Sequence, residues 1–494
     1  MQLRGTNGEA RVFEGRNFIN GEWQAAASGR TFEQRNPARL SEITGVFADS
    51  ASEDVDAAIT AAQDAFAPWR ALSPLSRRQY LDQALQQTIA KRDDIAAVIT
   101  RENGKTLLEA RSEVDSAVRE MDFQIAEGMR LCGQTLPVET EGTLAYSTRV
   151  ARGPVGVITP WNFPFNVPGR KCTPALIAGN TVVFKPASLT PRTGLLYTEL
   201  LANSGLPAGV FNCVTGGGKD VGGAIVSDPR IKAISFTGST SVGKSIQTQA
   251  AENLTATQLE LGGKNPAIVM PDADLDAAVE AIMLGAFACS GQWCTSTSRV
   301  IVLEEIAEEL TERLVAAIGR LRVGDGSTDE TAMGPVCGTR QKTDIERYID
   351  IGRSEGARLR AGGAALTGGT YDDGCFIAPT LFDRVAPDMK IARDEIFGPV
   401  LVVIAVTSFE EAVTVANDVA YGLSSSIFTR DLRSALSYME RAEVGLAHVN
   451  LMSALKEPQL PFGGVKASGA GLPEAGSEGI RFFTEHKVCY VRYR

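Results

Sequence analysis

Histidine and paired cysteines, the usual ligands of zinc, are scarce in this chain of 494 residues. It contains only two histidines, His448 and His486, and none of its eight cysteines sits in a CxxC pair. Because structural zinc sites need closely spaced Cys and His residues, the sequence argues against a zinc module. In a reducing compartment the thiols stay free, and we expect most of them to be small buried apolar residues.

A basic surface and a long apolar run are missing as well. Lys and Arg number 49 against 59 Asp and Glu, and this net charge of −10 argues against nucleic acid as a partner. The longest apolar runs, such as Leu401 to Val406, are far shorter than the ~18 residues of a membrane-spanning helix. Residues 1–15 lack the apolar core of a signal peptide. We therefore expect a cytoplasmic protein with no membrane partner.

The length and the hydrophobic pattern predict two or three α/β domains. Residues 54–127 carry apolar residues at the spacing of amphipathic helices. From Gly153 strands and helices alternate, which is typical of a doubly wound parallel sheet, and a second such series follows Gly262. Expected strands lie at 143–152, 155–160, 180–186, 209–216, 231–238, 265–270, 298–303, within 395–406, and at 422–429 and 487–494. Expected helices lie at 165–176, 190–204, 241–253, 275–289, 306–321 and 409–417. The last strand, 487–494, has no obvious partner nearby in the sequence.

Two cysteines, Cys289 and Cys294, lie in the stretch GAFACSGQWCTSTSRV at residues 285–300. A cysteine reacts as its thiolate, and the free thiol has a pKa of about 8.5. The small and polar neighbours of Cys294, such as Gly291 and Thr295, permit an exposed turn whose N–H groups point at a reacting oxygen. On these residues alone, both a nucleophile and a packing role remain open for Cys294.

Three further motifs supply polar groups that could act with a cysteine. Glu260, in QLELGGKNP, could act as a base if burial raises its pKa. Asn162, in TPWNFPFN, could donate its amide N–H to an oxyanion. Glu395, in EIFGPV, precedes a Phe-Gly-Pro turn and could reach a polar ligand.

Taken together and in order, these motifs resemble the aldehyde dehydrogenase superfamily. The resemblance runs from FINGEW at 18–23 through PWNFP, KPAS, FTGSTSVGK, LELGGKNP, GQWCT and EIFGPV to PFGGVKASGAG at 461–471. It implies the aldehyde dehydrogenase fold, an α/β fold with a Rossmann-like coenzyme domain, an α/β catalytic domain and a small oligomerisation hairpin. The implied boundaries are 1–123 and 153–261 for the coenzyme domain, 262–461 for the catalytic domain, and 130–152 with 472–494 for oligomerisation. A homodimer or homotetramer follows from the same resemblance.

The resemblance also implies a catalytic role for each motif. Cys294 would be the nucleophile, and Asn162 with the backbone N–H of Cys294 would form the oxyanion hole. Glu260 would activate the water that hydrolyses the thioester, and no metal is required. Cys289 falls outside the motif and is expected to be a packing residue. Glu260 also argues against a coenzyme-A-dependent relative, which needs no base, and the presence of all three catalytic residues argues against a non-catalytic protein on this fold.

The coenzyme implied by the resemblance is NADP or NAD. The fingerprint GxGxxG is absent after the first strand of the series, and FTGSTSVG stands after a later one. Many NAD-preferring members carry a glutamate where this chain has Ser188, and that carboxylate would repel a 2′-phosphate. The serine at this position predicts that the enzyme accepts NADP, and a preference for NADP over NAD is compatible with it. In the alternative, Ser188 has no influence on the choice and both coenzymes work. The expected coenzyme-binding residues are Ile158, Trp161, Asn162, Lys185, Ala187, Ser188, Gly218, Gly222, Phe236, Gly238, Ser239, Val242, Leu261, Glu395 and Phe397.

The expected substrate is a short anionic semialdehyde. Arg170, eight residues after Asn162, stands where arginine clamps the far carboxylate in succinate semialdehyde dehydrogenases, although it could instead pair with a structural acid. Lys456 could add a second positive charge, could be neutralised by Glu457, or could be exposed. Succinate semialdehyde dehydrogenases often carry a second arginine where this chain has Ala288, and a small hydroxyl residue where it has Lys456. These two departures favour 2-oxoglutarate semialdehyde over succinate semialdehyde, with phosphonoacetaldehyde or a broad range of neutral aldehydes as alternatives. The expected substrate-binding residues are Arg170, Trp293, Thr295 and Lys456.

Overall fold

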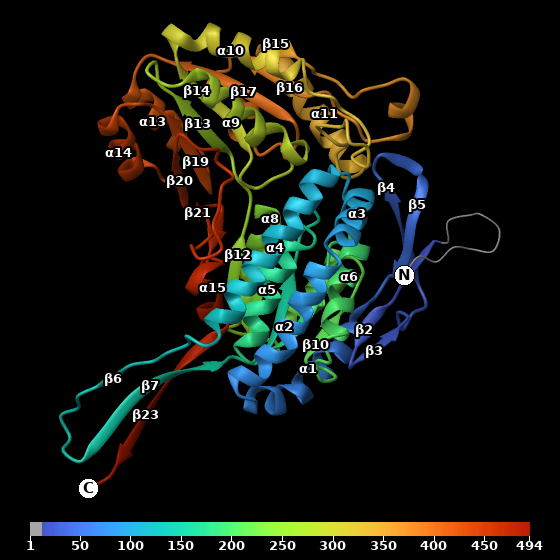
Figure 1. The fold of residues 1–494 in the computed structure, drawn as a ribbon, viewed down its shortest axis with the longest axis vertical. Coiled ribbons are helices and arrows are strands. Elements are labelled where there is room, and N and C mark those ends of the chain that lie inside the picture. Colours follow the sequence, from blue (N-terminus) through green and yellow to red (C-terminus); the bar gives the residue numbers. More distant parts are fainter. Residues whose placement is uncertain (1–11) are drawn as a thin grey trace.

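The computed structural model describes residues 12–494 and contains two large sheets flanked by helices, with a long ribbon of strands projecting from one end (Figure 1). The first large sheet has eight strands in the order β22-β12-β11-β8-β9-β10-β2-β3. Strands β12 to β10 of this order are parallel to one another. Their bounds are β22 Gly469–Ala470, β12 Ala256–Glu260, β11 Ala233–Thr237, β8 Pro154–Ile158, β9 Thr181–Lys185, β10 Phe211–Cys213, β2 Asn17–Ile19 and β3 Glu22–Gln24.

Helices cover both faces of the first sheet because alternate side chains of each strand are apolar on opposite faces. Val155 and Val157 of β8 join one buried cluster, and Ile158 joins the cluster on the other face. The elements packed in this half are α1 Ser52–Ala71, α2 Pro74–Ala90, α3 Arg92–Asn103, α4 Leu107–Glu127, α5 Asn166–Ile177, α6 Pro191–Ala202, η1 Gly218–Gly222, α7 Gly223–Ser227, α8 Thr240–Glu252 and α15 Gly476–Phe482.

The second large sheet has seven strands in the order β15-β16-β17-β14-β13-β19-β20, parallel except for the edge strand β15. Its strands are β15 Arg358–Ala361, β16 Thr380–Asp383, β17 Val400–Val406, β14 Thr297–Leu303, β13 Asn265–Val269, β19 Ser424–Phe428 and β20 Leu446–Val449. Its helices and turns are α9 Leu275–Phe287, η2 Ala288–Gly291, α10 Glu304–Ile318, α11 Thr339–Ser354, η3 Gly369–Asp373, α12 Lys390–Arg393, α13 Phe409–Asn417 and α14 Leu432–Arg441. Apolar clusters again cover both of its faces.

The projecting ribbon joins strands that are far apart in the sequence. Strand β23 (Thr484–Arg492) pairs antiparallel with β7 (Thr143–Ala151), and β6 (Thr135–Leu136) completes this three-stranded sheet. The terminal strand without an obvious partner in the sequence therefore has one in β7. The remaining short strands are β1 Phe13–Gly15, β4 Thr31–Asn36, β5 Arg39–Ala48, β18 Tyr421–Gly422 and β21 Val465–Lys466.

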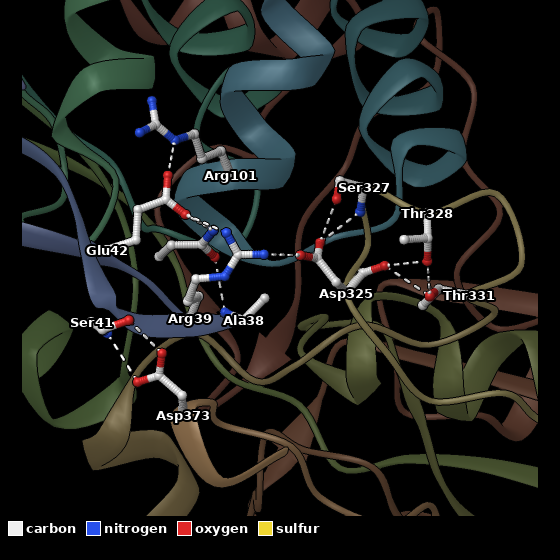
Figure 2. Close-up of polar contacts among 11 residues, drawn as sticks. Ala38, Arg39, Ser41, Glu42, Arg101, Asp325, Ser327, Thr328, Thr331 and Asp373 are labelled. Carbon is white, nitrogen blue, oxygen red and sulfur yellow. Dashed lines mark hydrogen bonds and ion pairs between the residues drawn. The ribbon is translucent and has the colours of Figure 1, made fainter. Parts of the chain in front are cut away.

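The first residues of β5 tie the two halves of the molecule together through polar contacts (Figure 2). Glu42 accepts a 2.6 Å hydrogen bond from Arg101 of α3, and Arg39 lies 3.9 Å from Asp325, which follows α10. The backbone N–H of Ser41 donates to Asp373 at 3.0 Å. Strand β5 therefore contacts a helix of the first half, and a loop and the 3-10 helix η3 of the second.

The two βα series predicted from the sequence are confirmed, with local differences. Helix α9 ends at Phe287 rather than 289, because Cys289 and Ser290 adopt left-handed backbone angles with φ of 50° and 57°. Helix α10 spans Glu304–Ile318 rather than 306–321. The sheet formed by β1, β4 and β5, and helix α11, were not predicted. Among residues 12–494, no helix is long and apolar enough to cross a membrane.

Candidate active site

The carboxyl ends of the parallel strands of the first sheet gather several of the predicted residues. The register places Ile158 beside both Lys185 and Phe236, and Thr237 beside Glu260. The strand order reverses at β8, which has β9 on one side and β11 on the other. In open α/β sheets, ligands bind outside the carboxyl ends of the strands at such a reversal. This edge is therefore the expected ligand-binding edge of the first half.

Cys294 lies at the amino ends of the strands of the second sheet, just before β14. Asn265, the first residue of β13, donates from Nδ2 to the carbonyl oxygens of Cys294 at 2.8 Å and of Ser296 at 2.9 Å. Its Oδ1 accepts a 3.0 Å hydrogen bond from the backbone N–H of Ser424, the first residue of β19. One buried amide thus fixes the backbone of the cysteine to two neighbouring strands.

The turn before Cys294 is strained, because left-handed backbone costs roughly 1–2 kcal/mol for a residue other than glycine. It is held in place by Cys289, whose N–H donates to Glu109 at 2.6 Å, and by Ser290, whose hydroxyl donates to the carbonyl of Gly334 at 2.8 Å. Cys289 is buried, and burial raises the pKa of its thiol well above the ordinary value. This is the environment of an unreactive packing cysteine.

The thiol of Cys294 is partly accessible, unlike that of Cys289. Burial raises the pKa of the Cys294 thiol to about 12, and the positive charge of Arg170 is the main influence in the opposite direction. In the protein without bound ligands this thiol is therefore protonated near neutral pH. It needs a nearby proton acceptor before it can act as a nucleophile.

Glu260 is a carboxyl group with the properties of a general base. It is buried at the end of β12, and Oε1 lies close enough to Gly463 that an added Cβ there would be 2.8 Å away. Burial, followed by the charge of Glu474, raises the pKa of Glu260 well above its usual range, against the influence of Lys171. A carboxyl group whose pKa is moved toward neutrality is suited to general-base work.

The two glycines after Glu260 allow Glu395 and Cys294 to approach the same backbone. The N–H of Gly263 donates to Glu395 Oε1 at 2.9 Å. A Cβ on Gly262 would lie 2.2 Å from Glu395 Oε2, and one on Gly263 would lie 2.4 Å from the Cys294 carbonyl oxygen. Burial raises the pKa of Glu395 to about 7. The Gly-Gly pair is thus required by close packing on both sides.

The segment PWNFP lies against the turn that carries Cys294. Asn162 is buried and donates from Nδ2 to the carbonyl oxygen of Gln292 at 3.0 Å. The ring of Trp161 packs edge-on against Phe397 at 5.4 Å between centroids, and the neighbouring Phe163 ring meets Trp293 at 5.5 Å. Asn162 therefore lies next to the backbone of the Cys294 turn, as an oxyanion donor must.

The predicted coenzyme residues KPAS and FTGSTSVG lie along the carboxyl edge of the first sheet. Burial lowers the pKa of Lys185 to about 8, and its Nζ donates to the carbonyl of Pro186 at 3.0 Å. Ser188 donates its hydroxyl to the carbonyl of Gly216 at 2.8 Å. Ser239 precedes α8 without capping it through its side chain, so the first N–H groups of α8 face this edge uncapped. The same edge includes Ala187, Gly218, Gly222, Gly238, Val242 and Leu261.

Arg170 of α5 is buried and lies between two acids. Its Nε lies 3.1 Å from Glu474 Oε2 and 3.6 Å from Glu120 Oε2, and its guanidinium stacks 4.6 Å from the centroid of the Phe462 ring. The structure thus contains acids that could pair with Arg170 for purely structural reasons. Even so, among residues 12–494, Nε and Nη1 of Arg170 have no partner in hydrogen-bonding geometry.

The position of Lys456 differs from two of the alternatives that the sequence left open. Its ammonium group pairs with Glu120, not with Glu457, and it donates to Asn166 Oδ1 at 3.3 Å. Lys456 therefore turns inward, toward Arg170, rather than into solvent. Thr295 is buried, and its carbonyl accepts a 2.8 Å hydrogen bond from Ser453 on the same loop.

Comparison with known proteins agrees with this arrangement. The family model described as "Aldehyde dehydrogenase family" matches residues 23–489. The chain belongs to the aldehyde dehydrogenase family.

Individual relatives cover almost the whole chain. It is 44% identical to the alpha-ketoglutaric semialdehyde dehydrogenase of Bacillus subtilis, over 96% of this chain and 98% of that protein. It is 40% identical to human retinaldehyde dehydrogenase 3, over 96% of this chain and 92% of that one. The solved NAD+ complex of an aldehyde dehydrogenase from Bacillus cereus superposes with a TM-score of 0.94 at 35% identity, covering 97% of both chains. The protein is thus an aldehyde-oxidising oxidoreductase with the aldehyde dehydrogenase fold.

Two acids of this aldehyde dehydrogenase, Glu120 and Glu474, were missed in the sequence. For Glu120 a signal existed, because Glu113, Glu120 and Glu127 are seven residues apart on α4 and all three are buried. This spacing places them on one face of the helix, toward α5. Glu113 also accepts hydrogen bonds from the N–H groups of Phe165 and Asn166 and so caps α5, the helix that carries Arg170.

No comparable signal marks Glu474, which lies in the loop before α15. It contacts Arg170, Lys171 and Thr237, residues that are more than two hundred positions away in the sequence. Among residues 12–494, no group of three or more His, Cys, Asp or Glu side chains is placed to hold a metal ion.

Proposed function

We propose that this aldehyde dehydrogenase oxidises a short semialdehyde with one distal carboxylate, foremost 2-oxoglutarate semialdehyde and then succinate semialdehyde. The observation that carries the proposal is a set of buried hydrogen-bond donors close to Cys294. These donors have no acceptor in hydrogen-bonding geometry. Among the described residues, Nη1 of Arg170 and Nδ2 of Asn166 have no hydrogen-bond partner, and Nε of Arg170 lies 3.1 Å from Glu474 without hydrogen-bonding geometry. Lys456 lies beside Asn166. Buried donors are satisfied in working proteins, so a bound carboxylate is the expected acceptor. The name of the Bacillus subtilis relative supports this substrate class.

In the proposed mechanism, Cys294 loses its proton to a water molecule in the site, and its sulfur adds to the aldehyde carbon. Asn162 Nδ2 and the backbone N–H of Cys294 donate hydrogen bonds to the oxygen that becomes negative, a contribution of ~10²–10³ in rate for one such donor. A dinucleotide bound beside these residues would supply the hydride acceptor that oxidises the adduct to the thioester. Glu260 then takes a proton from the water that attacks the thioester carbon, and the acid leaves as the Cys294 sulfur is released.

The same proposal assigns coenzyme binding to the carboxyl edge of the first sheet and makes residues 1–123 and 153–261 the coenzyme domain. Lys185 would contact the adenosine ribose, Gly238 and Ser239 the pyrophosphate, and Glu395 the nicotinamide ribose. No carboxylate stands at Ser188 to repel a 2′-phosphate, so NADP is accepted alongside NAD. The catalytic domain is then 262–461.

A second candidate, a broad dehydrogenase of neutral aldehydes, is favoured by one observation. Arg170 already lies near two carboxylates, Glu120 and Glu474, so its charge is largely compensated. The 40% identity to human retinaldehyde dehydrogenase 3 is compatible with this candidate. The distinction rests on whether the remaining donors of Arg170 bind a substrate anion.

We also propose that the protein is a homodimer or homotetramer held together in part by residues 130–152 and 472–494. The ribbon of β6, β7 and β23 extends away from the main body (Figure 1). It exposes large apolar side chains to solvent, among them Leu136, Tyr146, Val488 and Tyr490. Such a surface is typical of a subunit interface.

The substrate proposal is tested by steady-state kinetics with 2-oxoglutarate semialdehyde, succinate semialdehyde and hexanal, following reduced coenzyme with NAD and with NADP. In Arg170→Gln we expect kcat/KM for both semialdehydes to fall about 100-fold, because a charged hydrogen bond is lost, and that for hexanal to change little. Arg192→Gln is the matched control, since Arg192 pairs with Glu199 away from Cys294. Equal use of hexanal by the wild type, or an unchanged Arg170→Gln variant, would support the neutral-aldehyde candidate instead.

A further inference from the structure

Five charged side chains form a compact group beside Cys294 and Glu260, which we name the buried charge cluster: Glu120, Arg170, Lys171, Lys456 and Glu474. Four of the five are buried, and the side chain of Lys456 is 25% exposed. Glu474 pairs with Arg170 at 3.1 Å and contacts Lys171 directly. Glu120 contacts Lys456 directly and lies 3.6 Å from Arg170.

The cluster has an excess of positive charge. Three cations face two carboxylates. The neighbouring Glu260 and Cys294 lie outside this count, and burial raises the pKa of both groups, which favours their uncharged forms. Another buried ion pair, Lys105 with Glu113 at 2.6 Å, combines one positive and one negative charge and leaves this excess unchanged. One further negative charge would therefore neutralise the cluster, and a second would remain uncompensated in a buried site, which is strongly unfavourable.

Glu120 is the acid that lowers the excess positive charge at the place where a substrate carboxylate would bind. It is the acid that contacts Lys456, and it shares Arg170 with Glu474. Its Oε2 has no hydrogen-bonding partner among the described residues, although it is buried. Glu120 therefore does not act as a fully bonded structural anchor. It reduces the positive charge around the unused donors of Arg170 and Asn166.

We propose that Glu120 is a specificity-determining residue that restricts the substrate to one negative charge, so that a carboxylate is accepted and a dianionic phosphonate is rejected. This inference rests on the proposed function, since it concerns the head group of the same anionic aldehyde. Without Glu120 the cluster would carry two excess positive charges and would match a dianion. With Glu120 in place it matches a monoanion.

The test compares kcat/KM for 2-oxoglutarate semialdehyde, phosphonoacetaldehyde and hexanal at pH 8, where a phosphate-like group is mostly dianionic. For Glu120→Gln we expect the ratio of phosphonate to carboxylate activity to rise by about tenfold or more over the wild type. Glu127→Gln is the matched control, because Glu127 lies on the same helix but pairs with Arg130. The control should leave the ratio unchanged.

Two more variants distinguish an effect of the net charge of the cluster from an effect of altered side-chain geometry. Lys456→Gln removes one cation, and we expect the ratio of phosphonate to carboxylate activity to fall below that of the wild type. The double variant Glu120→Gln with Lys456→Gln restores the single excess charge, so its ratio should return to within about threefold of the wild type. Lys456 is on a loop and partly exposed, so its substitution tests the idea even if Glu120→Gln folds poorly.

Two results would overturn the inference. One is an unchanged ratio in Glu120→Gln when that variant still oxidises hexanal at the wild-type rate. The other is a double variant that keeps the ratio of Glu120→Gln rather than that of the wild type. Failure of the proposed function itself would look different, because the wild type would then prefer hexanal to both anions.

Discussion

The two large sheets of this aldehyde dehydrogenase are built alike but face the site with opposite ends. Both are doubly wound, mainly parallel and covered by helices on two faces. The first presents the carboxyl ends of its strands, which carry Ile158, Lys185 and Glu260. The second presents the amino ends, where Asn265 and Cys294 lie. Ligands of open α/β sheets usually bind outside the carboxyl ends of the strands. This rule therefore holds for the first sheet and not for the second.

The difference shows how one short motif can belong to both sheets. In LELGGKNP, Glu260 is the last residue of β12, and Asn265 is the first residue of β13. The chain leaves the carboxyl edge of one sheet and enters the amino edge of the other within these few residues. A single passage of the chain from the first sheet to the second thus places both the proposed base, Glu260, and Asn265, which holds the backbone of Cys294. Substitutions at the two edges should therefore have distinct effects on the reaction.

At the amino edge, Cys294→Ala is expected to have the largest effect. The variant lacks the proposed nucleophile, so kcat should fall about 10⁴-fold or more, measured as formation of reduced coenzyme. Cys289→Ala is the matched control, because its thiol is buried and lies in the same turn. If Cys289→Ala were the inactive variant, the assignment of the two cysteines would be reversed.

At the carboxyl edge, Glu260→Gln should block the second half of the reaction. We expect a burst of about one equivalent of reduced coenzyme per site, followed by turnover slowed by about 10²–10⁴-fold, because the thioester is no longer hydrolysed with a base. Rapid-mixing absorbance measures both phases. Loss of the burst itself would show that Glu260 acts before hydride transfer.

The pH dependence gives an independent check on Glu260. Its pKa is raised by burial and by Glu474, and the base must be ionised to act. The wild-type kcat should therefore increase with pH well above the usual carboxyl range and level off once Glu260 is ionised, provided that thioester hydrolysis limits turnover. The increase should disappear in Glu260→Gln. A profile that is flat in the wild type from pH 5 to 9 would contradict this assignment.

An intermediate effect is expected for Asn265→Asp, which keeps the shape of the side chain. A carboxylate cannot donate to the carbonyls of Cys294 and Ser296, so the loss of two buried hydrogen bonds should lower the free energy of unfolding by about 2–3 kcal/mol. Activity should fall with the displaced cysteine. Denaturant unfolding and kcat together measure this, and wild-type values for both would show that Asn265 does not hold the turn.

The smallest effect is expected at the coenzyme, with Ser188→Glu. The new carboxylate should repel a 2′-phosphate and shift the ratio of kcat/KM values toward NAD by about tenfold or more, with little change in the NAD value itself. Ser239→Ala, at the proposed pyrophosphate site, should affect both coenzymes equally. An unchanged ratio in Ser188→Glu would place this side chain away from the 2′ position.

The sequence was a good guide where a pattern is local. Helix α13 spans Phe409–Asn417 as predicted, because its apolar spacing and the Ser408 cap lie within one short stretch. The family resemblance supplied residues such as Asn162 and Cys294, which the structure brings together through Gln292. Lys456 and Glu120 pair across 336 residues, a contact that the pattern around either residue does not indicate. Ion pairs of this kind depend on tertiary packing rather than on local periodicity.

The pairing of β7 with β23 has a consequence for synthesis on the ribosome. Arg152, which follows β7, pairs with Glu485 of β23, and 333 positions separate them. At roughly 5–20 residues per second, β7 waits about 15–70 s for its partner strand. During that interval it offers an open strand edge with apolar side chains, which invites pairing with another nascent chain. Neighbouring ribosomes on one messenger would therefore bring together chains at the stage when exchange of this strand is easiest.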